Sequence, residues 1–260
     1  MASRQPHPEM PLKTSLQYVV VEQEAELSGN HLLALLSRDD AADWGPQLER
    51  VELSLGQVLS DSGQPPAYVY FPTTAIVSLL YTTAEGECSE IAVVGCDGLV
   101  GISVFMGGNA TPSQAVVQSA GQAWRLPARV VRQGSATSPA LLQVLLGYTR
   151  SMLAQVAQTA ACNRYHSIDQ LLCRRLLLGL DRSASASLVM TQELVANLLG
   201  VRREGVTSAA LRLQQAGVIS YSRGRISVLD RSQLEARTRG TACARGAARG
   251  GVVAEEVATA

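Results

Sequence analysis

The sequence predicts an α+β protein built, in chain order, from an antiparallel β-roll, a long helix and a compact C-terminal unit of short helices and a hairpin. Three observations support this. Short alternating segments, separated by Gly, Pro or acidic turns, fill residues 50–127. A seam of mainly apolar residues at spacings of four and three follows from Leu141. Residues 190–229 combine two short helical patterns with a hairpin pattern.

The length of the chain and the distribution of its charges agree with a division into two domains. The 260 residues are enough for two domains with separate cores. The formal net charge of zero hides an asymmetry, because residues 1–140 carry 7 basic and 14 acidic side chains, whereas residues 191–260 carry 10 and 6. All basic residues except Lys13 are Arg. An acidic front half with a basic back half is typical of a sensing part joined to a part that binds nucleic acid.

Targeting and metal-binding patterns are absent from the sequence. Residues 1–30 lack a charged segment followed by an apolar core, so we expect no signal peptide. The apolar run 171–180 is too short to span a membrane, and we expect a cytoplasmic protein. The three His show no ligand spacing and predict no metal site. Five Cys without a CxxC pair predict free thiols: Cys88, Cys96, Cys162, Cys173 and Cys243.

The first half of the chain is expected to be the roll. Residues 1–30 are a polar lead-in that we expect to be flexible, and a short helical pattern covers 30–36. A polar stretch with Trp44 and Pro46 follows. The expected strands are 51–55, 58–59, 68–71, 76–81, 90–94, 114–118 and 123–126. Many short strands at this spacing indicate an antiparallel roll or sandwich, assigned to residues 31–136.

Residues 137–187 are expected to form the dimerisation helix and hinge. Ser138 and Pro139 are a start signal for the long helix. Its seam is a candidate dimer interface, with the alternative that the seam simply covers the roll. The seam residues are Leu141, Leu145, Tyr148, Met152 and Gln155. A capping box, Ser167 to Gln170, starts a second helix that runs to about residue 180. Residues 181–187 read as a flexible connection.

Residues 188–235 predict a winged helix-turn-helix. Thr191 is the expected N-cap of the first helix, and Ala196 lies four residues before Gly200, where two helices can cross. Gly217 ends the second helix, and strands at 219–221 and 226–229 flank a turn. Residues 236–260 are rich in Ala, Gly and Arg without periodicity, and we expect a disordered tail.

Polar residues on the second helix and the wing are the candidate contacts to double-stranded DNA. They are Arg202, Arg203, Glu204, Thr207, Ser208 and Arg212 on the helix, and Arg223 and Arg225 on the wing. In a major groove, Arg pairs with guanine and Glu accepts a hydrogen bond from cytosine. Gly205 lies within this helix, at a cost of roughly 1 kcal/mol if it is exposed.

The order of these parts resembles the Crp/Fnr family of bacterial transcription regulators over roughly residues 31–235. The strongest similarity is LLGVRREGVTSAALRLQQAGVI with the wing, and TAACNRYHSIDQLLCRRLL resembles the family's hinge. The resemblance implies a cyclic-nucleotide-binding-like roll, a homodimer paired along the long helix, a near-palindromic operator and contact with RNA polymerase. Arg203 and Glu204 match the family's base-reading pair, whereas Ser208 stands where a third base-reading Arg is common.

The effector pocket departs from the family pattern. Cyclic-nucleotide members hold the ribose with a Glu and the phosphate with an Arg-Ser pair. Here Ile102 stands in place of that Glu and Pro112 in place of that Arg, within the degenerate pocket Gly101, Ile102, Ser103, Pro112 and Ser113. Because a buried phosphate without a cation is unfavourable, we expect no cyclic AMP in the usual pose, and the effector is unknown.

Two other classes of function are open to this sequence. One is an effector-binding protein that acts through protein contacts and keeps a vestigial DNA-binding part. The base-reading pair Arg203 and Glu204 disfavours this class, because a vestigial part would have no reason to keep it. The other is a cysteine hydrolase using Cys162 and His166, but no oxyanion-forming turn or orienting acid accompanies them, and we expect no enzyme. Cys88 and Cys96 are a further hypothesis, as a redox pair in the roll.

Overall fold

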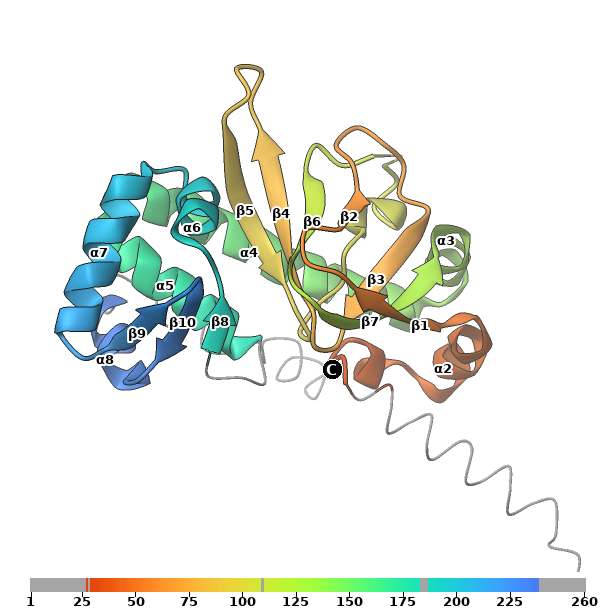
Figure 1. The fold of residues 1–260 in the computed structure, drawn as a ribbon. Coiled ribbons are helices and arrows are strands. Elements are labelled where there is room, and N and C mark those ends of the chain that lie inside the picture. The colour runs from red at the N-terminus through yellow and green to blue at the C-terminus, as the bar shows by residue number, and fades with distance from the viewer. Residues whose placement is uncertain (1–26, 28, 109, 183–186, 239–260) are drawn as a thin grey trace, which may run out of the picture.

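The computed structural model describes residue 27 and residues 29–108, 110–182 and 187–238. Figure 1 shows two bodies joined by the long helix α4 (Pro139–Tyr165). The β-roll lies on the right, and a mainly helical body lies on the left, which we call the head and define as residues 168–238. The predicted α+β class and the order of its parts are confirmed.

The roll consists of two antiparallel sheets. The first has three strands in the order β1 (Glu49–Leu53), β7 (Gly121–Pro127) and β3 (Tyr68–Pro72). The second has four in the order β2 (Val58–Ser60), β6 (Gln114–Ser119), β4 (Ile76–Thr82) and β5 (Cys88–Val94). All seven predicted strands are present, and β5 is an edge strand. Figure 1 shows that this edge faces the head.

The segment before the roll contains a helix that the sequence interpretation missed. Only a 3₁₀ turn, η1 (Leu33–Leu35), lies within the predicted 30–36 helix, and it is followed by α2 (Arg38–Trp44) and η2 (Gly45–Gln47). Ser37 caps α2, since its Oγ accepts from the backbone N–H of Asp40 at 3.1 Å. Trp44 is buried, 5.9 Å from Phe71 between ring centroids. The Ser37 cap with acidic residues in the first turn was the available signal.

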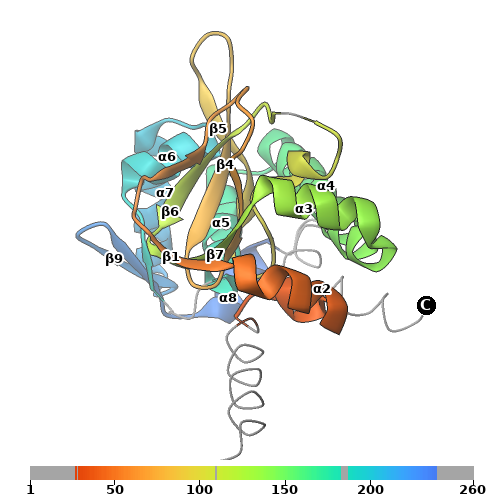
Figure 2. The same ribbon diagram turned by 90° about the vertical axis from the view of Figure 1, so that its right-hand side faces the viewer.

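A short helix also separates the roll from α4. After β7, the chain forms α3 (Ala128–Thr137), which Figure 2 shows beside the start of α4. The expected bounds of the roll, residues 31–136, include nearly all of this helix. The predicted start of α4 is confirmed, because Ser138 Oγ accepts from the backbone N–H of Leu141 at 3.2 Å, with Pro139 in the first turn.

The seam predicted as a dimer interface packs instead inside the chain. Leu141, Leu145, Tyr148 and Met152 are all buried in the core of the roll. Tyr148 Oη donates to the backbone carbonyl of Leu99 at 2.9 Å, and burial raises the pKa of this phenol. Gln155 Nε2 donates to the carbonyl of Val93 on β5 at 3.3 Å. The alternative interpretation, that this stripe covers the roll, is therefore the one that the structure supports.

The head is a second core. Its elements are α5 (Ile168–Asp181), β8 (Ser187–Val189), α6 (Gln192–Leu199), α7 (Arg203–Gln215), β9 (Ile219–Ser222), β10 (Arg225–Val228) and α8 (Arg231–Thr238). Leu172, Leu176, Val206 and Leu213 lie in one buried cluster, so α5 belongs to this core and the head begins before the predicted residue 188. The predicted capping box of α5 is present. Strand β8 was not predicted.

Three predicted segments lie largely outside the residues that the structure describes. The flexible connection predicted at 181–187 lies largely outside the described residues, although α5 continues to Asp181 and β8 begins at Ser187. The predicted lead-in and the predicted tail lie outside them as well, apart from their inner ends. At the C-terminal end, α8 extends to Thr238, with Leu234 buried.

Gly121 at the start of β7 is expected to be intolerant of substitution. A Cβ there would lie 2.5 Å from the backbone N of Ala75 and 2.7 Å from the carbonyl carbon of Thr74, so backbone would have to move. Gly121→Ala should lower the free energy of unfolding by about 3 kcal/mol, in the range of overpacked cores. Gly108→Ala is the control, since its Cβ would meet nothing closer than 3.6 Å. Equal unfolding midpoints in urea for the two variants would contradict the expectation.

Candidate nucleic-acid interface

Helices α6 and α7 form the predicted helix-turn-helix. Thr191 Oγ1 accepts from the backbone N–H of Leu194 at 3.1 Å, which confirms the N-cap of α6. Gly200 ends α6 in the left-handed region with a φ of 62°, a conformation that favours glycine. The core between the helices is fully buried and includes Val195, Ala196, Val206, Ala209 and Leu213. The cap, the glycine and the buried residues between the helices, all close in sequence, therefore set the orientation of α7 relative to α6.

The outward side of α7 is polar and open to solvent. Five of the predicted contact residues are exposed there: Arg202, Arg203, Glu204, Thr207 and Ser208. Thr207 Oγ1 lies 2.7 Å from Oε1 of Gln192 at the start of α6, and 3.0 Å from the carbonyl oxygen of Arg203. The two helices are thus linked beside the face that would meet a groove.

Arg212, predicted as a sixth contact on this helix, is engaged elsewhere. Its guanidinium forms a two-pronged ion pair with Asp169 of α5, with Nε 2.9 Å from Oδ2 and Nη2 in contact with Oδ1. The hydrogen bond from Arg212 lowers the pKa of Asp169. In this structure Arg212 joins α7 to α5, and its contact with DNA stays a prediction.

Gly205 is explained by packing. A Cβ at this position would lie 2.6 Å from Cδ1 of Ile168, so the absence of a side chain lets α5 approach α7 closely. The residue is half-buried, and the expected cost of an exposed glycine does not apply. The sequence pattern alone could not reveal this, because Ile168 belongs to a different helix.

The wing is a three-stranded sheet with its turn at the outer end. The strand order is β8-β10-β9, and Ser222 pairs with Arg225 across the two-residue turn Arg223-Gly224. Both turn residues have positive φ, 49° and 74°, as in the hairpin turns that match strand twist. Arg223 is exposed at the tip, whereas Arg225 is exposed on β10 and donates to Ser187 Oγ at 3.2 Å.

The predicted effector residues all lie on the roll, and none of the five carries a positive charge. Gly101 has a φ of 113° and precedes the 3₁₀ turn η3 (Ile102–Val104), which carries half-buried Ile102 and buried Ser103. Pro112 is exposed and its carbonyl accepts from Ser62 Oγ at 2.9 Å. Ser113 is buried, and its carbonyl accepts from Thr111 Oγ1 at 2.9 Å. No Arg or Lys occurs between Asp97 and Trp124 in the sequence.

The cysteine hypotheses find no support. Cys88 begins β5 and Cys96 lies beyond its end, so their Cα atoms are roughly 20 Å apart at the usual rise of a strand. A disulfide needs Cα atoms within about 7 Å, so the redox-pair hypothesis is wrong. Cys162 is completely buried, and a substrate cannot reach its thiol. Within the described residues, no group of three His, Cys, Asp or Glu side chains could hold a metal ion.

Over the part of the chain that the structure describes, no helix is both long enough and apolar enough to span a bilayer.

Comparison with known families and structures gives two domain matches. The cyclic nucleotide-binding domain family matches residues 50–137, and the Crp-like helix-turn-helix domain family matches residues 171–237. The second match includes α5 from Leu171 onward, in agreement with the core of the head. No sequence among the curated proteins matches this chain significantly.

Solved structures share the fold. A transcriptional regulator of the CRP/FNR family from Thermus thermophilus is 22% identical, with a TM-score of 0.60 over 74% of this chain and 98% of that chain. FixK2 from Bradyrhizobium japonicum is 15% identical, with a TM-score of 0.62 over 73% and 96%. The c-di-GMP responsive global regulator CLP from Xanthomonas campestris is 14% identical, with a TM-score of 0.59 over 75% and 100%.

The two domain matches together cover more than half of the chain and correspond to the roll and the head in their observed order. The helix-turn-helix has the buried core and the exposed polar helix that reading DNA requires. The chain belongs to the Crp/Fnr family and is a DNA-binding transcription regulator.

Proposed function

We propose that the protein works in the cytoplasm as a homodimer on a near-palindromic operator, with α7 in the major groove of each half-site. Arg203 pairs with a guanine and Glu204 with a cytosine, while Thr207 and Ser208 line the same groove. Arg202, Arg223 and Arg225 contact phosphates. The observation that carries this proposal is the exposed polar side of α7 next to an exposed arginine at the tip of the wing. Regulation would proceed through contact with RNA polymerase.

The proposed pairing surface is the side of α4 that points away from the roll, which we call the outer face. Leu146 and Leu153 are 42% and 61% exposed there, an unusual exposure for leucines on one helix side. The outer face is completed by small exposed residues that allow a second helix to approach closely: Ala154, Ala157, Ala160 and Ala161. This surface replaces the seam from Leu141 to Gln155, which is occupied by the chain's own roll.

The operator proposal is tested by mapping the sites that the protein occupies on its genome and titrating the purified chain onto the best of them. The expected result is two inverted half-sites, centred about one helical turn apart, with two chains per duplex. The rival interpretation, a regulator that acts through protein contacts with a vestigial head, expects weak binding that does not distinguish the mapped sites from scrambled duplexes. Such a result would remove the proposal.

The signal sensed by the roll is proposed to be something other than cyclic AMP in the usual pose. The segment from Asp97 to Trp124 has no cation for a phosphate, and Ile102 and Pro112 occupy the two positions at which the family holds ribose and phosphate. An uncompensated buried phosphate is unfavourable by several kcal/mol.

Calorimetry with cyclic AMP at micromolar concentrations should therefore give no specific heat of binding. A saturable isotherm with one ligand per chain would contradict this expectation. The matched variant Pro112→Arg should remain silent as well, since Ile102 still blocks the ribose position and the local backbone would have lost the φ restraint of proline.

A further inference from the structure

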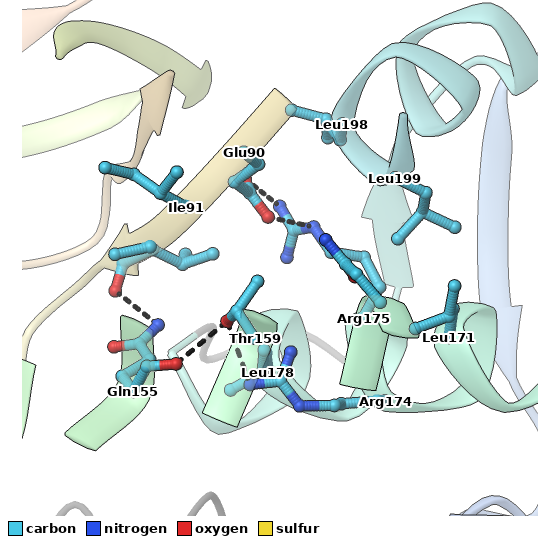
Figure 3. A pocket seen from close by; sticks show the side chains of 13 residues that line it. Glu90, Ile91, Gln155, Thr159, Leu171, Arg174, Arg175, Leu178, Leu198 and Leu199 are labelled. Atoms are coloured by element: carbon cyan, nitrogen blue, oxygen red, sulfur yellow. Dashed lines mark hydrogen bonds and ion pairs between the residues drawn. The ribbon is translucent and has the colours of Figure 1, made fainter. Parts of the chain in front are cut away.

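A buried ionic cluster joins the roll to the head. Glu90 lies on the edge strand β5, and Arg175 lies on α5 of the head (Figure 3). Their side chains are 7% and 2% exposed; Arg175 Nη2 donates to Glu90 Oε2 at 3.1 Å, and Nε lies 2.9 Å from Oε1 as an ion-pair contact without a hydrogen bond. A hydrogen bond between two charged groups is shorter and stronger than one between neutral groups. Such a pair defines both the distance and the angle between two bodies.

The cluster reaches across the four-stranded sheet. Ser78 Oγ on β4 donates to Glu90 Oε2 at 2.5 Å and lies 3.1 Å from Gln118 Oε1 on β6. The same Gln118 oxygen accepts from Arg175 Nη2. Arg175 of the head therefore contacts two strands directly, through Glu90 of β5 and Gln118 of β6, and Ser78 of β4 contacts both of these partners. A change in the relative position of β4, β5 and β6 would alter these contacts directly.

Other contacts place the head on the same edge. Arg182, near the end of α5, pairs with Asp97 just beyond β5, with Nη2 2.7 Å from Oδ2. A Cβ on Gly95 would lie 2.6 Å from Cβ of Arg182, and a Cβ on Gly200 in the helix-turn-helix would lie 3.5 Å from Ser89 Oγ. The end of α6 and the body of α5 thus cover the free edge of β5.

The junction is closed to all but the smallest molecules. Its cavity has a volume of about 20 Å³ and is lined by Glu90, Gln155, Thr159, Arg174 and Arg175 among others. This is enough for a single water molecule and too small for an organic effector. The surface between roll and head therefore serves contact between the two bodies rather than ligand binding.

We infer that Glu90 and Arg175 are positioning residues that hold the head in its DNA-reading orientation on its own roll. The inference rests on the proposed function. With the head docked, Arg203 and Arg223 are exposed, so this position leaves the reading surface free. A dimer with both heads docked presents its two α7 helices at one separation, and one spacing of half-sites is preferred. Removing one partner leaves the other charge buried without compensation, which releases the head.

The experiment compares full-length wild type with Glu90→Gln, Arg175→Met and the double variant Glu90→Met with Arg175→Met. Binding is titrated on operators with the mapped spacing and with half-sites moved by about five base pairs, half a helical turn. Wild type should prefer the mapped spacing. In each single variant, the ratio of the affinities for the mapped and the shifted spacing should fall at least tenfold. The affinity for an isolated half-site should stay within twofold of wild type. The double variant should regain most of the preference, because an apolar pair can replace a buried ion pair.

Hydrogen exchange of the β5 backbone supplies a readout that needs no DNA. Release of the head should speed exchange at least tenfold at β5 in the single variants and little in the double variant. Arg231→Met is the matched control, since it breaks the exposed contacts of Arg231 with Asp181 and Glu235 inside the head. If a single variant fails to fold, Arg175→Lys replaces it and should lose part of the spacing preference, because lysine lacks the planar guanidinium that meets both Glu90 and Gln118.

Unchanged spacing preference together with unchanged exchange at β5 would overturn the inference. A rise in the affinity of the single variants for operators of every spacing would overturn it too, since the docked position of the head would then hinder DNA binding. If wild type bound no operator at all, the proposed function would fail, whereas the exchange data would still decide whether the pair docks the head.

Discussion

Replacing Leu146 and Leu153 with glutamate is expected to give a monomer whose affinity for a palindromic operator is lower by roughly 10²–10³-fold. The two leucines are exposed on the outer face of α4, so their loss leaves the core of a single chain intact. In a dimer, four carboxylates would gather about the twofold axis without counter-charges. Once pairing is lost, the second half-site no longer benefits from the high effective concentration that a linked partner provides.

Light scattering and operator titrations measure this outcome, with the unfolding midpoint as a check on the fold. Leu55→Glu is the matched control, because Leu55 is 57% exposed on the roll and should leave the dimer unchanged. The double variant Leu145→Glu with Met152→Glu should instead unfold the chain, since Leu145 and Met152 are buried in the core. A folded, dimeric L146E/L153E variant would move the interface away from the outer face.

Replacing Arg203 with alanine is expected to cost roughly 1–3 kcal/mol per half-site on the best operator and to relax the preference at one base pair in each half-site. A palindrome contains this contact twice, so the loss approaches roughly 30-fold to 10⁴-fold when both half-sites are engaged. The reason is that a base contact acts only at its own position, whereas a phosphate contact releases counterions whatever the sequence.

Arg223→Ala at the wing tip is the comparison. It should weaken operator and scrambled duplexes alike and reduce the salt slope of log affinity by about one unit for each contact removed. Titrations of both variants on both duplexes at several salt concentrations separate the two roles. If Arg203→Ala reduced both affinities equally, Arg203 would be a phosphate contact, and α7 would not lie in the groove as proposed.

Much of the fold was readable from local sequence. Alternation and turn residues located all seven strands of the roll, and Ser138, Ser167 and Thr191 marked three helix starts that the structure confirms. Caps, turns and strand alternation act between residues a few positions apart, so a single sequence carries them. Helix α2 was also signalled in this way, by Ser37 and the acidic residues after it, although the prediction overlooked it.

Helical spacing predicted the exposure of the candidate interface residues but not the partners of their side chains. The polar side of α7 could be derived from helical spacing, and Arg202, Arg203, Glu204, Thr207 and Ser208 are exposed as that spacing requires. Arg212 follows the same spacing, yet it pairs with Asp169, 43 residues earlier in the chain. Helical periodicity specifies that a side chain points outward and says nothing about which other helix lies there.

The sequence by itself thus determined the order of the parts, the seven strands of the roll, the starts of α4, α5 and α6, and the helix-turn-helix. Only the tertiary structure decided which side of α4 covers the roll, why Gly205 is needed beside Ile168, and that Arg175 meets Glu90 across 85 residues. The physical reason is the separation along the chain of the residues that interact. Backbone hydrogen bonds and caps depend on near neighbours, whereas the burial of a face or a charge depends on which distant surface comes to cover it.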